Sequence, residues 1–364
     1  MARPAQSSSW AIRVSTLTWA ALVISFLCGL PVVLGFTWLL LPALAALAAV
    51  IALPVAWLWR CGWRPARSRP WAKVWARTSA GLWFLLCGAV AAPIYFLAVT
   101  TEARPAIVPT ITLGNGTRTI VLQGMQHVGA ERFYQAVVYD LEKALADGYL
   151  LAYEGVADSD AEANAWFRTT LSHGKDLGDS YRELGKMCGL SYQIDYFGPL
   201  VADARTHPER HVTMDVNTRA MKQEYDRLMQ ADPAFAAAMR EREAPAAADD
   251  DAPDVIGWLI ERQKAGDERR RVLAGTLCRG LMTQVMRRTN ERQGGAMDSV
   301  VLDFRNRHLA AQLLSDPHPR IYVTYGAAHL PGVMDIIKRE PGWKVESIKW
   351  MRTIAAPEHL EGQL

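Results

Sequence analysis

Two similar motifs carry the residue types best suited to chemistry in this chain. Residues 119–129 read TIVLQGMQHVG, and residues 320–332 read RIYVTYGAAHLPG. Each motif is an apolar, strand-like run followed by Gly-x-x-His, a further glycine and a helical pattern. The glycine–histidine pairs are Gly124 with His127 and Gly326 with His329. Glycine at a strand end permits tight turning, and ligands bind at the carboxyl ends of parallel strands, so we expect both imidazoles at one site.

A carboxylate and a guanidinium are predicted to complete this site. The apolar run YLLAYEGV (149–156) finishes in Glu154. Two histidines and a glutamate are ligands for a divalent ion, which would lower the pKa of a bound water and supply a nucleophile. His127, His329 and Glu154 are therefore the predicted metal ligands, with Glu154 as ligand or catalytic base. Alternatively, one histidine acts as a general base without a metal. Arg305 could hold a substrate carboxylate or an oxyanion.

The elements that must position these residues follow an α/β pattern. A hairpin is expected around Asn115–Gly116, before the first motif. A helical pattern ending at Gly148 and a strand follow the first motif; in the second, Pro341–Gly342 end the helix before the last strand. Strand, helix and strand with short connections predict parallel strands. We expect an α/β fold with a parallel or mixed sheet built from two related βαβ halves.

A helical insertion, about 160–315, is expected between the two halves. Helical periodicity covers the following ranges: 161–190, 218–242, 256–292 and 297–314. The segment EREAPAAADDDAPD (241–254) is rich in alanine, proline and aspartate, which favours a flexible loop.

The first 100 residues indicate a membrane anchor with three transmembrane helices. No charged residue occurs between Ser15 and Trp59, and a bilayer core needs roughly 20 apolar residues, so this run predicts two spans. The three expected spans are about 15–35, 36–59 and 79–99. Residues 101–110 are then a linker, and 111–356 the α/β domain.

The basic residues predict the orientation in the membrane. The loop between the second and third spans contains six Lys/Arg and no acid, which is typical of a cytoplasmic loop. The domain after the third span is then expected outside the cytoplasm, on a bacterial inner membrane. Residues 101–364 carry a net charge of +3 − 8 = −5, because the first 100 residues hold eight basic and no acidic residues. We therefore expect no nucleic-acid partner.

Cys188 and Cys278 would lie in an oxidising compartment if this topology holds, so a single disulfide bond between them is one alternative. Two buried thiols are the simpler expectation, because the sequence supplies no geometry.

Several motifs together resemble the TraB/PrgY–TIKI superfamily, related to GumN-type and erythromycin-esterase-like proteins. The resemblance covers roughly residues 110–355. Its motifs are GMQH (124–127), YEG with Glu154, FRNRHLA with Arg305 and Asn306, YGAAHLPGV (325–333) and, more loosely, HVTMDVN (211–217) with Asp215.

This resemblance implies an α/β fold in which both glycine–histidine motifs converge on one pocket. It also implies divalent-metal-dependent proteolysis outside the cell, with manganese or cobalt favoured and zinc as a further alternative. His127, His329 and Glu154 would be central, and Arg305 a substrate or structural partner. The supporting residues would be Gly124, Gly326, Asn306 and Asp215.

The leading hypothesis is a membrane-anchored, metal-dependent hydrolase, peptidase-like, acting on a peptide or small-molecule substrate outside the cytoplasm. The alternative is a non-catalytic regulatory protein that binds a peptide, a metal or haem. A third hypothesis is a metal-free esterase with a histidine base. The sequence leaves the oligomeric state open.

Overall fold

The computed structural model describes most of the chain. The described residues are 14–20, 23, 38–62, 68–171, 176–243, 268–291 and 295–355. The chain divides into two compact units. The first comprises residues 1–99 and 256–277, and the second residues 100–255 and 278–364.

Two helices of the described residues are long and apolar enough to cross a membrane. They are α2 (Leu40–Gly62, 23 residues) and α4 (Trp71–Ala103, 33 residues), each with a most apolar window of mean hydropathy 2.2. These helices correspond to the predicted spans 36–59 and 79–99. The first predicted span, 15–35, lies largely outside the described residues, so helices of spanning length and composition are found for two of the three predictions.

Small side chains line the buried face of α2. Ala48, Ala52 and Ala56 follow one another at four-residue spacing and are fully buried. Residues of this size let helix backbones approach closely in a membrane, where helix association depends on packing. The indole of Trp75 on α4 donates a hydrogen bond to the carbonyl oxygen of Ala49 at 3.0 Å. A polar contact thus joins the two helices.

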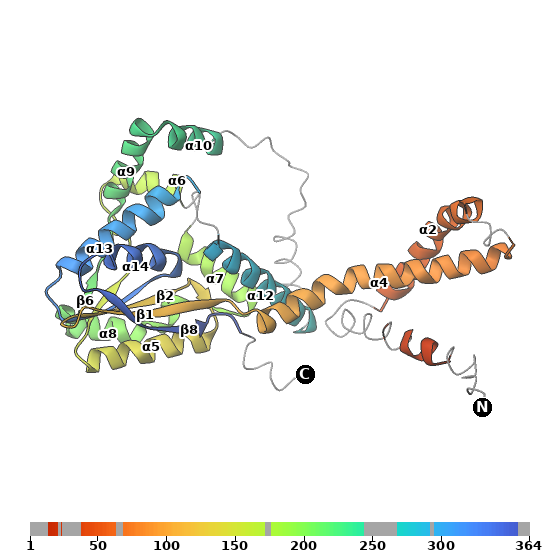
Figure 1. Ribbon diagram of the computed structural model, residues 1–364, viewed down its shortest axis with the longest axis horizontal. Helices are drawn as coiled ribbons and strands as arrows, with labels where there is room; N and C mark the ends of the chain where they lie inside the picture. Colours follow the sequence, from red (N-terminus) through yellow and green to blue (C-terminus); the bar gives the residue numbers. More distant parts are fainter. Residues whose placement is uncertain are drawn as a thin grey trace, which may run out of the picture. The chain divides into compact units, whose positions relative to one another are not determined.

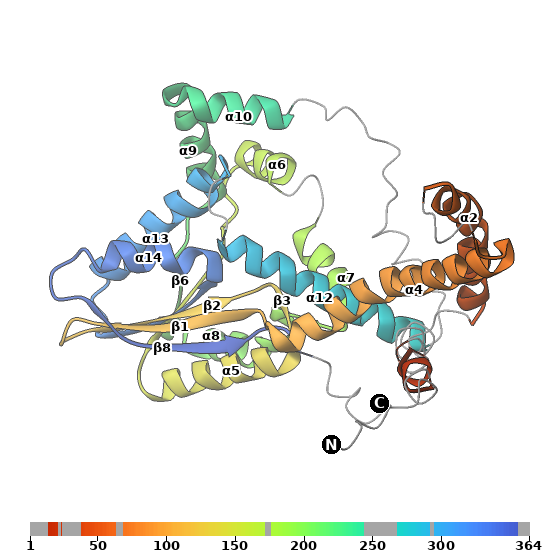
Figure 2. The ribbon, with the colours of Figure 1, turned by 45° about the vertical axis from the view of Figure 1, so that its right-hand side comes forward.

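The second unit is built on a mixed six-stranded sheet (Figures 1 and 2). The strand order is β6-β4-β7-β2-β1-β8. The strands are β1 (Ile107–Gly114), β2 (Thr119–Met125), β4 (Leu150–Tyr153), β6 (His211–Thr213), β7 (Arg320–Gly326) and β8 (Lys344–Arg352). The first four strands of that order are mutually parallel, whereas β1 is antiparallel to both of its neighbours.

The two predicted halves are confirmed in strand direction but not as pairs of neighbours. In the first half, α5 (Glu131–Ala146) connects β2 to β4, with β7 lying between them. In the second, α14 (Leu330–Ile337) connects β7 to β8 across β2 and β1. The pairings give both strands of each half the same direction. Because the halves advance toward opposite edges of the sheet with the same crossover hand, their helices cover opposite faces.

Each face of the sheet has its own hydrophobic core. One face packs against α5 and α8 (Gly198–Thr206), and the other against α13 (Arg305–Ser315) and α14 (Figure 1). On the α5 face, Tyr134, Val137 and Leu141 are fully buried at helical spacing. Burial of this kind is the main source of stability for such a layered domain.

The start of the second unit differs from the prediction in one respect. The predicted hairpin is confirmed: β1 and β2 are antiparallel, and the Oδ1 atom of Asn115 accepts hydrogen bonds from the next turn residues while Gly116 has φ +90°. Residues 101–110, however, are mostly regular structure instead of a linker. Residues 101–103 end α4, and 107–110 already belong to β1.

The predicted helical insertion is mainly helical, but it also supplies an edge strand. Its elements are α6 (Ala161–Thr170), α7 (Leu177–Cys188), the 3-10 turn η1 (Gln193–Tyr196), α8, α9 (Thr218–Ala231), α10 (Pro233–Glu243), α12 (Glu268–Glu291), a π-helix (Ser299–Phe304) and α13. The strand β6, which pairs in parallel with β4, is an addition to the mostly helical expectation. A short strand pair, β3 (Val128–Gly129) with β5 (Ser191–Tyr192), forms a second sheet. Residues 244–254 of the predicted loop lie outside the described residues.

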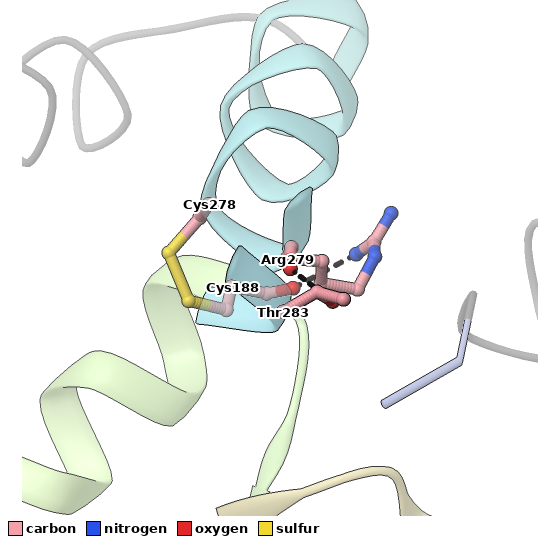
Figure 3. The surroundings of a disulfide bond; sticks show 4 residues. All are labelled: Cys188, Cys278, Arg279 and Thr283. Carbon is pink, nitrogen blue, oxygen red and sulfur yellow. Dashed lines mark hydrogen bonds between the residues drawn. A yellow bond between two sulfur atoms is a disulfide. The ribbon is translucent and has the colours of Figure 1, made fainter. Parts of the chain in front are cut away.

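Cys188 and Cys278 form a disulfide bond, which corrects the expectation of two thiols (Figure 3). Cys188 ends α7 and Cys278 lies on α12, with a Cα–Cα distance of 4.9 Å. The Nη1 atom of Arg279 donates to the carbonyl oxygen of Cys188 at 2.8 Å. This hydrogen bond is a second link between α12 and the end of α7. This proximity arises from tertiary packing across 90 residues of sequence, which no local pattern reveals.

Candidate functional site

Four adjacent parallel strands bring the predicted residues to one edge of the sheet. Asp215 follows β6, Glu154 follows β4, Gly326 ends β7 and His127 follows β2. The carboxyl ends of parallel strands meet at the same edge, where α/β proteins bind ligands. His329 follows β7 through a 3-10 turn, residues 327–329.

Arg305 is the residue that connects the members of this edge. It is the first residue of α13, and its side chain is only 7% exposed. Its Nη2 atom donates to Glu154 Oε1 and to Asp215 Oδ2, both at 2.6 Å, and its Nη1 atom lies 3.2 Å from His329 Nε2. The guanidinium also lies over the Tyr325 ring, 5.2 Å from its centroid. Burial alone would lower the pKa of Arg305, but the hydrogen bonds to Asp215 and the charge of Glu154 outweigh burial and raise this pKa.

Asp215 is the fully buried counter-ion of Arg305. Its side chain is 0% exposed, and Arg305 contacts both of its oxygens, through Nε at 3.0 Å and Nη2 at 2.6 Å. The backbone N–H groups of Gly155 and Val216 donate to the same carboxylate at 3.0 and 2.8 Å. Burial opposes ionisation, but the hydrogen bonds from Arg305 outweigh it and hold the pKa of Asp215 below its usual range. The loosely matched aspartate is thus central to the cluster.

Glu154 is fixed at both oxygens but remains open to solvent. Oε1 accepts from Arg305, and Oε2 accepts from the backbone N–H of Gly326 at 2.6 Å. Its side chain is nevertheless 23% exposed. A carboxylate oxygen can accept more than one hydrogen bond, so Glu154 keeps capacity for a further donor. A methyl group on Gly326 would lie 3.2 Å from Oε2, which explains the value of glycine there.

His329 is buried as a neutral ring with a defined tautomer. Its Nδ1 atom lies 2.7 Å from Asn306 Oδ1, which can only accept, so Nδ1 carries the proton and Nε2 accepts from Arg305. Burial, reinforced by the neighbouring positive charge of Arg305, lowers the pKa of His329 to about 4. Tyr325 packs edge-on against the ring at 4.7 Å between centroids.

His127 lies at the same edge in a more open environment. Its side chain is exposed, stacks on Tyr181 at 4.4 Å between ring centroids, and contacts Gln193 Nε2 through Nδ1 at 3.0 Å. Partial desolvation of the ring lowers the pKa of His127; the charge of Glu154 opposes this shift and that of Arg305 adds to it. With the Gln193 amide nitrogen as donor, Nδ1 accepts and the neutral ring carries its proton on Nε2. The two imidazoles are therefore not equivalent.

A cavity of about 380 Å³ adjoins Glu154. Its wall also includes Gln193, the partner of His127, and residues from η1, α8 and β6. The cavity thus borders Glu154, whose carboxylate is the more exposed of the two that contact Arg305. Two carboxylates against one guanidinium leave this cluster with one net negative charge when His329 is neutral.

Two of the three predicted metal ligands, His329 and Glu154, are engaged by Arg305 in this arrangement. His329 Nε2 and Glu154 Oε1 are 3.8 Å apart, and both already accept hydrogen bonds from Arg305, a permanent cation. Among the described residues, no group of three or more His, Cys, Asp or Glu side chains is arranged to hold a metal ion. Metal dependence stays a prediction.

Sequence reasoning missed several residues that position the predicted ones. Tyr325, directly before Gly326, packs against both Arg305 and His329, and its place inside the second motif was a usable signal. Gly332 lies so close to the Asn306 side chain that an added methyl would collide with it. Gln193 had no sequence signal, because its approach to the edge depends on the path of the insertion.

Comparison of the chain with protein-family models, curated proteins and solved structures finds no match. The resemblance to the TraB/PrgY–TIKI superfamily therefore stays a prediction.

Proposed function

We propose that this protein is a membrane-anchored hydrolase that cleaves an acyl bond, peptide-like in kind, outside the cytoplasm. The observation that carries the proposal is the state of Glu154. Its carboxylate is held at both oxygens by Arg305 and Gly326, yet it borders a cavity of about 380 Å³. A fixed carboxylate with remaining acceptor capacity beside a cavity is suited to general-base chemistry.

In the proposed reaction, Glu154 accepts a proton from water as the water oxygen bonds to the carbonyl carbon. The carbonyl oxygen becomes an oxyanion in the tetrahedral intermediate. Collapse of this intermediate breaks the bond to the leaving group, which receives the proton from Glu154. The products are a carboxylic acid and an amine or alcohol, and Glu154 returns to its ionised form.

His127 is the proposed donor to the developing oxyanion. In the tautomer that Gln193 favours, the neutral ring has its proton on Nε2, away from that contact. Because Nε2 carries the proton, the expected role of His127 is hydrogen-bond donation, and the lowered pKa of His127 favours this neutral form. His329 is buried and engaged by Arg305 and Asn306, which fits a role in positioning.

Arg305 and Asp215 are proposed to position Glu154. Arg305 directs the glutamate through Nη2, while the paired oxygens of Asp215 prevent the guanidinium from rotating. A bidentate arginine–carboxylate pair gives this kind of fixed geometry. A buried arginine serving only one carboxylate would orient that carboxylate less well.

Two features support the extracytoplasmic placement in the proposal. The basic residues between and at the ends of α2 and α4 favour the cytoplasm for the start of α4. A single crossing by α4 then carries the second unit out, irrespective of the first predicted span. The disulfide between Cys188 and Cys278 is of the kind that persists in oxidising compartments. A reporter fused after Leu364 that is active only in the cytoplasm would contradict this placement.

Peptide cleavage by the full-length protein in lipid nanodiscs tests the activity. A degenerate peptide library would be incubated with the wild type, Glu154→Gln and His127→Phe, and the products identified by mass spectrometry. We expect the Glu154→Gln rate to fall by about 10²–10⁴-fold, the usual worth of a positioned base. Glu209→Gln is the matched control, since Glu209 has a 67% exposed side chain.

The same assay with chelator and with added manganese addresses the predicted metal dependence. Cleavage that survives chelator favours the metal-free reaction, and cleavage restored only by manganese favours the metal-dependent one. Peptide binding without any cleavage, under each metal condition, would refute the hydrolase proposal and favour the regulatory binding protein. Full activity in Glu154→Gln would remove the assigned base.

A further inference from the structure

The cavity beside Glu154 has a wall that the proposed reaction does not use. The wall is formed largely by η1 and α8, packed over the ends of β4 and β6. Its apolar members include Met125, Ile194, Phe197, Leu200 and Val201. The η1–α8 wall of the cavity is therefore largely apolar.

Two of these apolar side chains, those of Ile194 and Val201, are exposed to solvent. Ile194 is 53% exposed and Val201 is 49% exposed, whereas Leu200, deeper in the wall, is 3% exposed. Isolated exposed apolar residues need no explanation, but these two line the same cavity as Glu154. An apolar group entering the cavity would cover both and gain the usual hydrophobic stabilisation.

Two polar residues of the wall, Tyr153 and His211, already have hydrogen-bond partners. Tyr153 donates from its hydroxyl to His211 Nδ1 at 2.8 Å, and His211 Nε2 donates to Asp203 Oδ2 at 2.8 Å. The Tyr153 and His211 rings are nearly parallel, with an interplanar angle of 3°. Because each donor in this chain of Tyr153, His211 and Asp203 is already paired, the chain needs no hydrogen bond from a molecule bound in the cavity. An anionic occupant would face the net negative charge of the Arg305 cluster, and none of the described residues that line the cavity is a lysine or arginine that could pair with it.

From these features we infer that the cavity is a specificity pocket for one large apolar side chain, aromatic or branched aliphatic, next to the scissile bond of a peptide-like substrate. The inference rests on the proposed function, because it takes Glu154 as the reacting edge of the pocket. The volume of about 380 Å³ is at the lower end of ligand pockets and accommodates such a side chain with adjoining backbone.

Binding and cleavage by the full-length protein in nanodiscs test the inference separately. The binding probes are two fluorescein-labelled hexapeptides that differ only in phenylalanine or alanine at the third position, titrated onto the Glu154→Gln protein to prevent turnover. We expect the phenylalanine peptide to bind about tenfold more tightly, as burial of one large apolar side chain predicts. Cleavage by the wild type is measured with the degenerate library and should occur next to large apolar residues.

A matched pair of substitutions on α8 assigns the preference to this pocket. Ala204 lines the cavity, and Ala202 lies two residues away beside a different surface hollow. Ala204→Phe should fill the pocket and abolish the preference for phenylalanine, while Ala202→Phe should retain it. Val201→Asp is a second test that places a charge at an exposed position, so folding is not at stake. It should reduce binding of the phenylalanine peptide about tenfold, with little change for the alanine peptide.

The outcomes distinguish the pocket from the reaction. Equal binding of the two peptides, no binding of either, or a preference unchanged in Ala204→Phe and Val201→Asp would overturn the pocket, even if cleavage still depends on Glu154. A preference lost in those variants without any cleavage by the wild type would support an apolar binding pocket and refute the hydrolase.

Discussion

Protonation of His329 should destabilise the fold as the pH falls from about 6.5 to about 4. The folded-state pKa of His329 is about 4, against 6.5 for an ordinary histidine, because the ring is buried beside Arg305. Between these two pH values the unfolded chain binds a proton that the folded chain excludes. The contribution of His329 to the free energy of unfolding is therefore fully present above about pH 6.5 and is lost as the pH falls. A difference of about 2.5 pKa units corresponds to about 3 kcal/mol, lost progressively across this window.

Urea unfolding of the full-length protein in detergent, followed at intervals between pH 7.5 and pH 4, measures this loss. His329→Asn removes the titrating group, so its free energy of unfolding should decrease with acidification by about 3 kcal/mol less than that of the wild type. His207→Asn is the control, because His207 has a 45% exposed side chain. Carboxylates with lowered pKa values add acid sensitivity to all three proteins, and the difference between proteins cancels it. Parallel pH profiles for the wild type and His329→Asn would refute the reasoning.

Three further substitutions test the cluster and the disulfide. Asp215→Asn should lower the free energy of unfolding by about 3 kcal/mol, since Arg305 would lose its fully buried counter-ion. Gly326→Ala should slow the proposed hydrolysis at least about tenfold with little loss of stability, because the added methyl lies against the Glu154 carboxylate. Cys188→Ser should cost up to about 4 kcal/mol, because the disulfide closes a loop of 90 residues. Urea unfolding measures the first and third, and peptide cleavage the second.

Each of these substitutions has its own control and its own contradictory result. Asp147→Asn changes an exposed aspartate at a helix end and should leave stability unaltered. Gly198→Ala adds a methyl with no atom within 4 Å, so activity should be retained. Reductant should lower the stability of the wild type but not of Cys188→Ser. Equal effects of a substitution and its control would contradict the corresponding contact.

Local patterns predicted the parts of this fold that depend on local chemistry. The hairpin at Asn115–Gly116 follows from turn preference, and the alternation of strand and helix follows from periodicity. The meeting of His127, Glu154 and Gly326 at one sheet edge followed from the rule that parallel strands end together. These inferences needed no knowledge of which strands are neighbours.

The rest depends on long-range pairing that no single sequence reveals. The interpretation of HVTMDVN as part of a helical region missed β6, whose short strand is stable only beside β4. Asp215 therefore gained its place from the pairing of an edge strand, and Arg305 from the packing of α13 on one face of the sheet. The disulfide between Cys188 and Cys278 was only an alternative for the same reason, because α7 and α12 meet only in the folded domain.

The π-helix before α13 makes the site sensitive to chain length in an unusual way. Its six residues, Ser299–Phe304, end directly before Arg305 and Asn306, the two residues that engage Glu154, Asp215 and His329. An α-helix advances by about 100° per residue, so removal of one residue from this wide turn would rotate both side chains away together. Insertions and deletions in this segment are thus far more constrained than substitutions. A chain that retains Arg305 and Asn306 but has a shorter turn before them would have the same residue types at the site but would not place them in the same geometry.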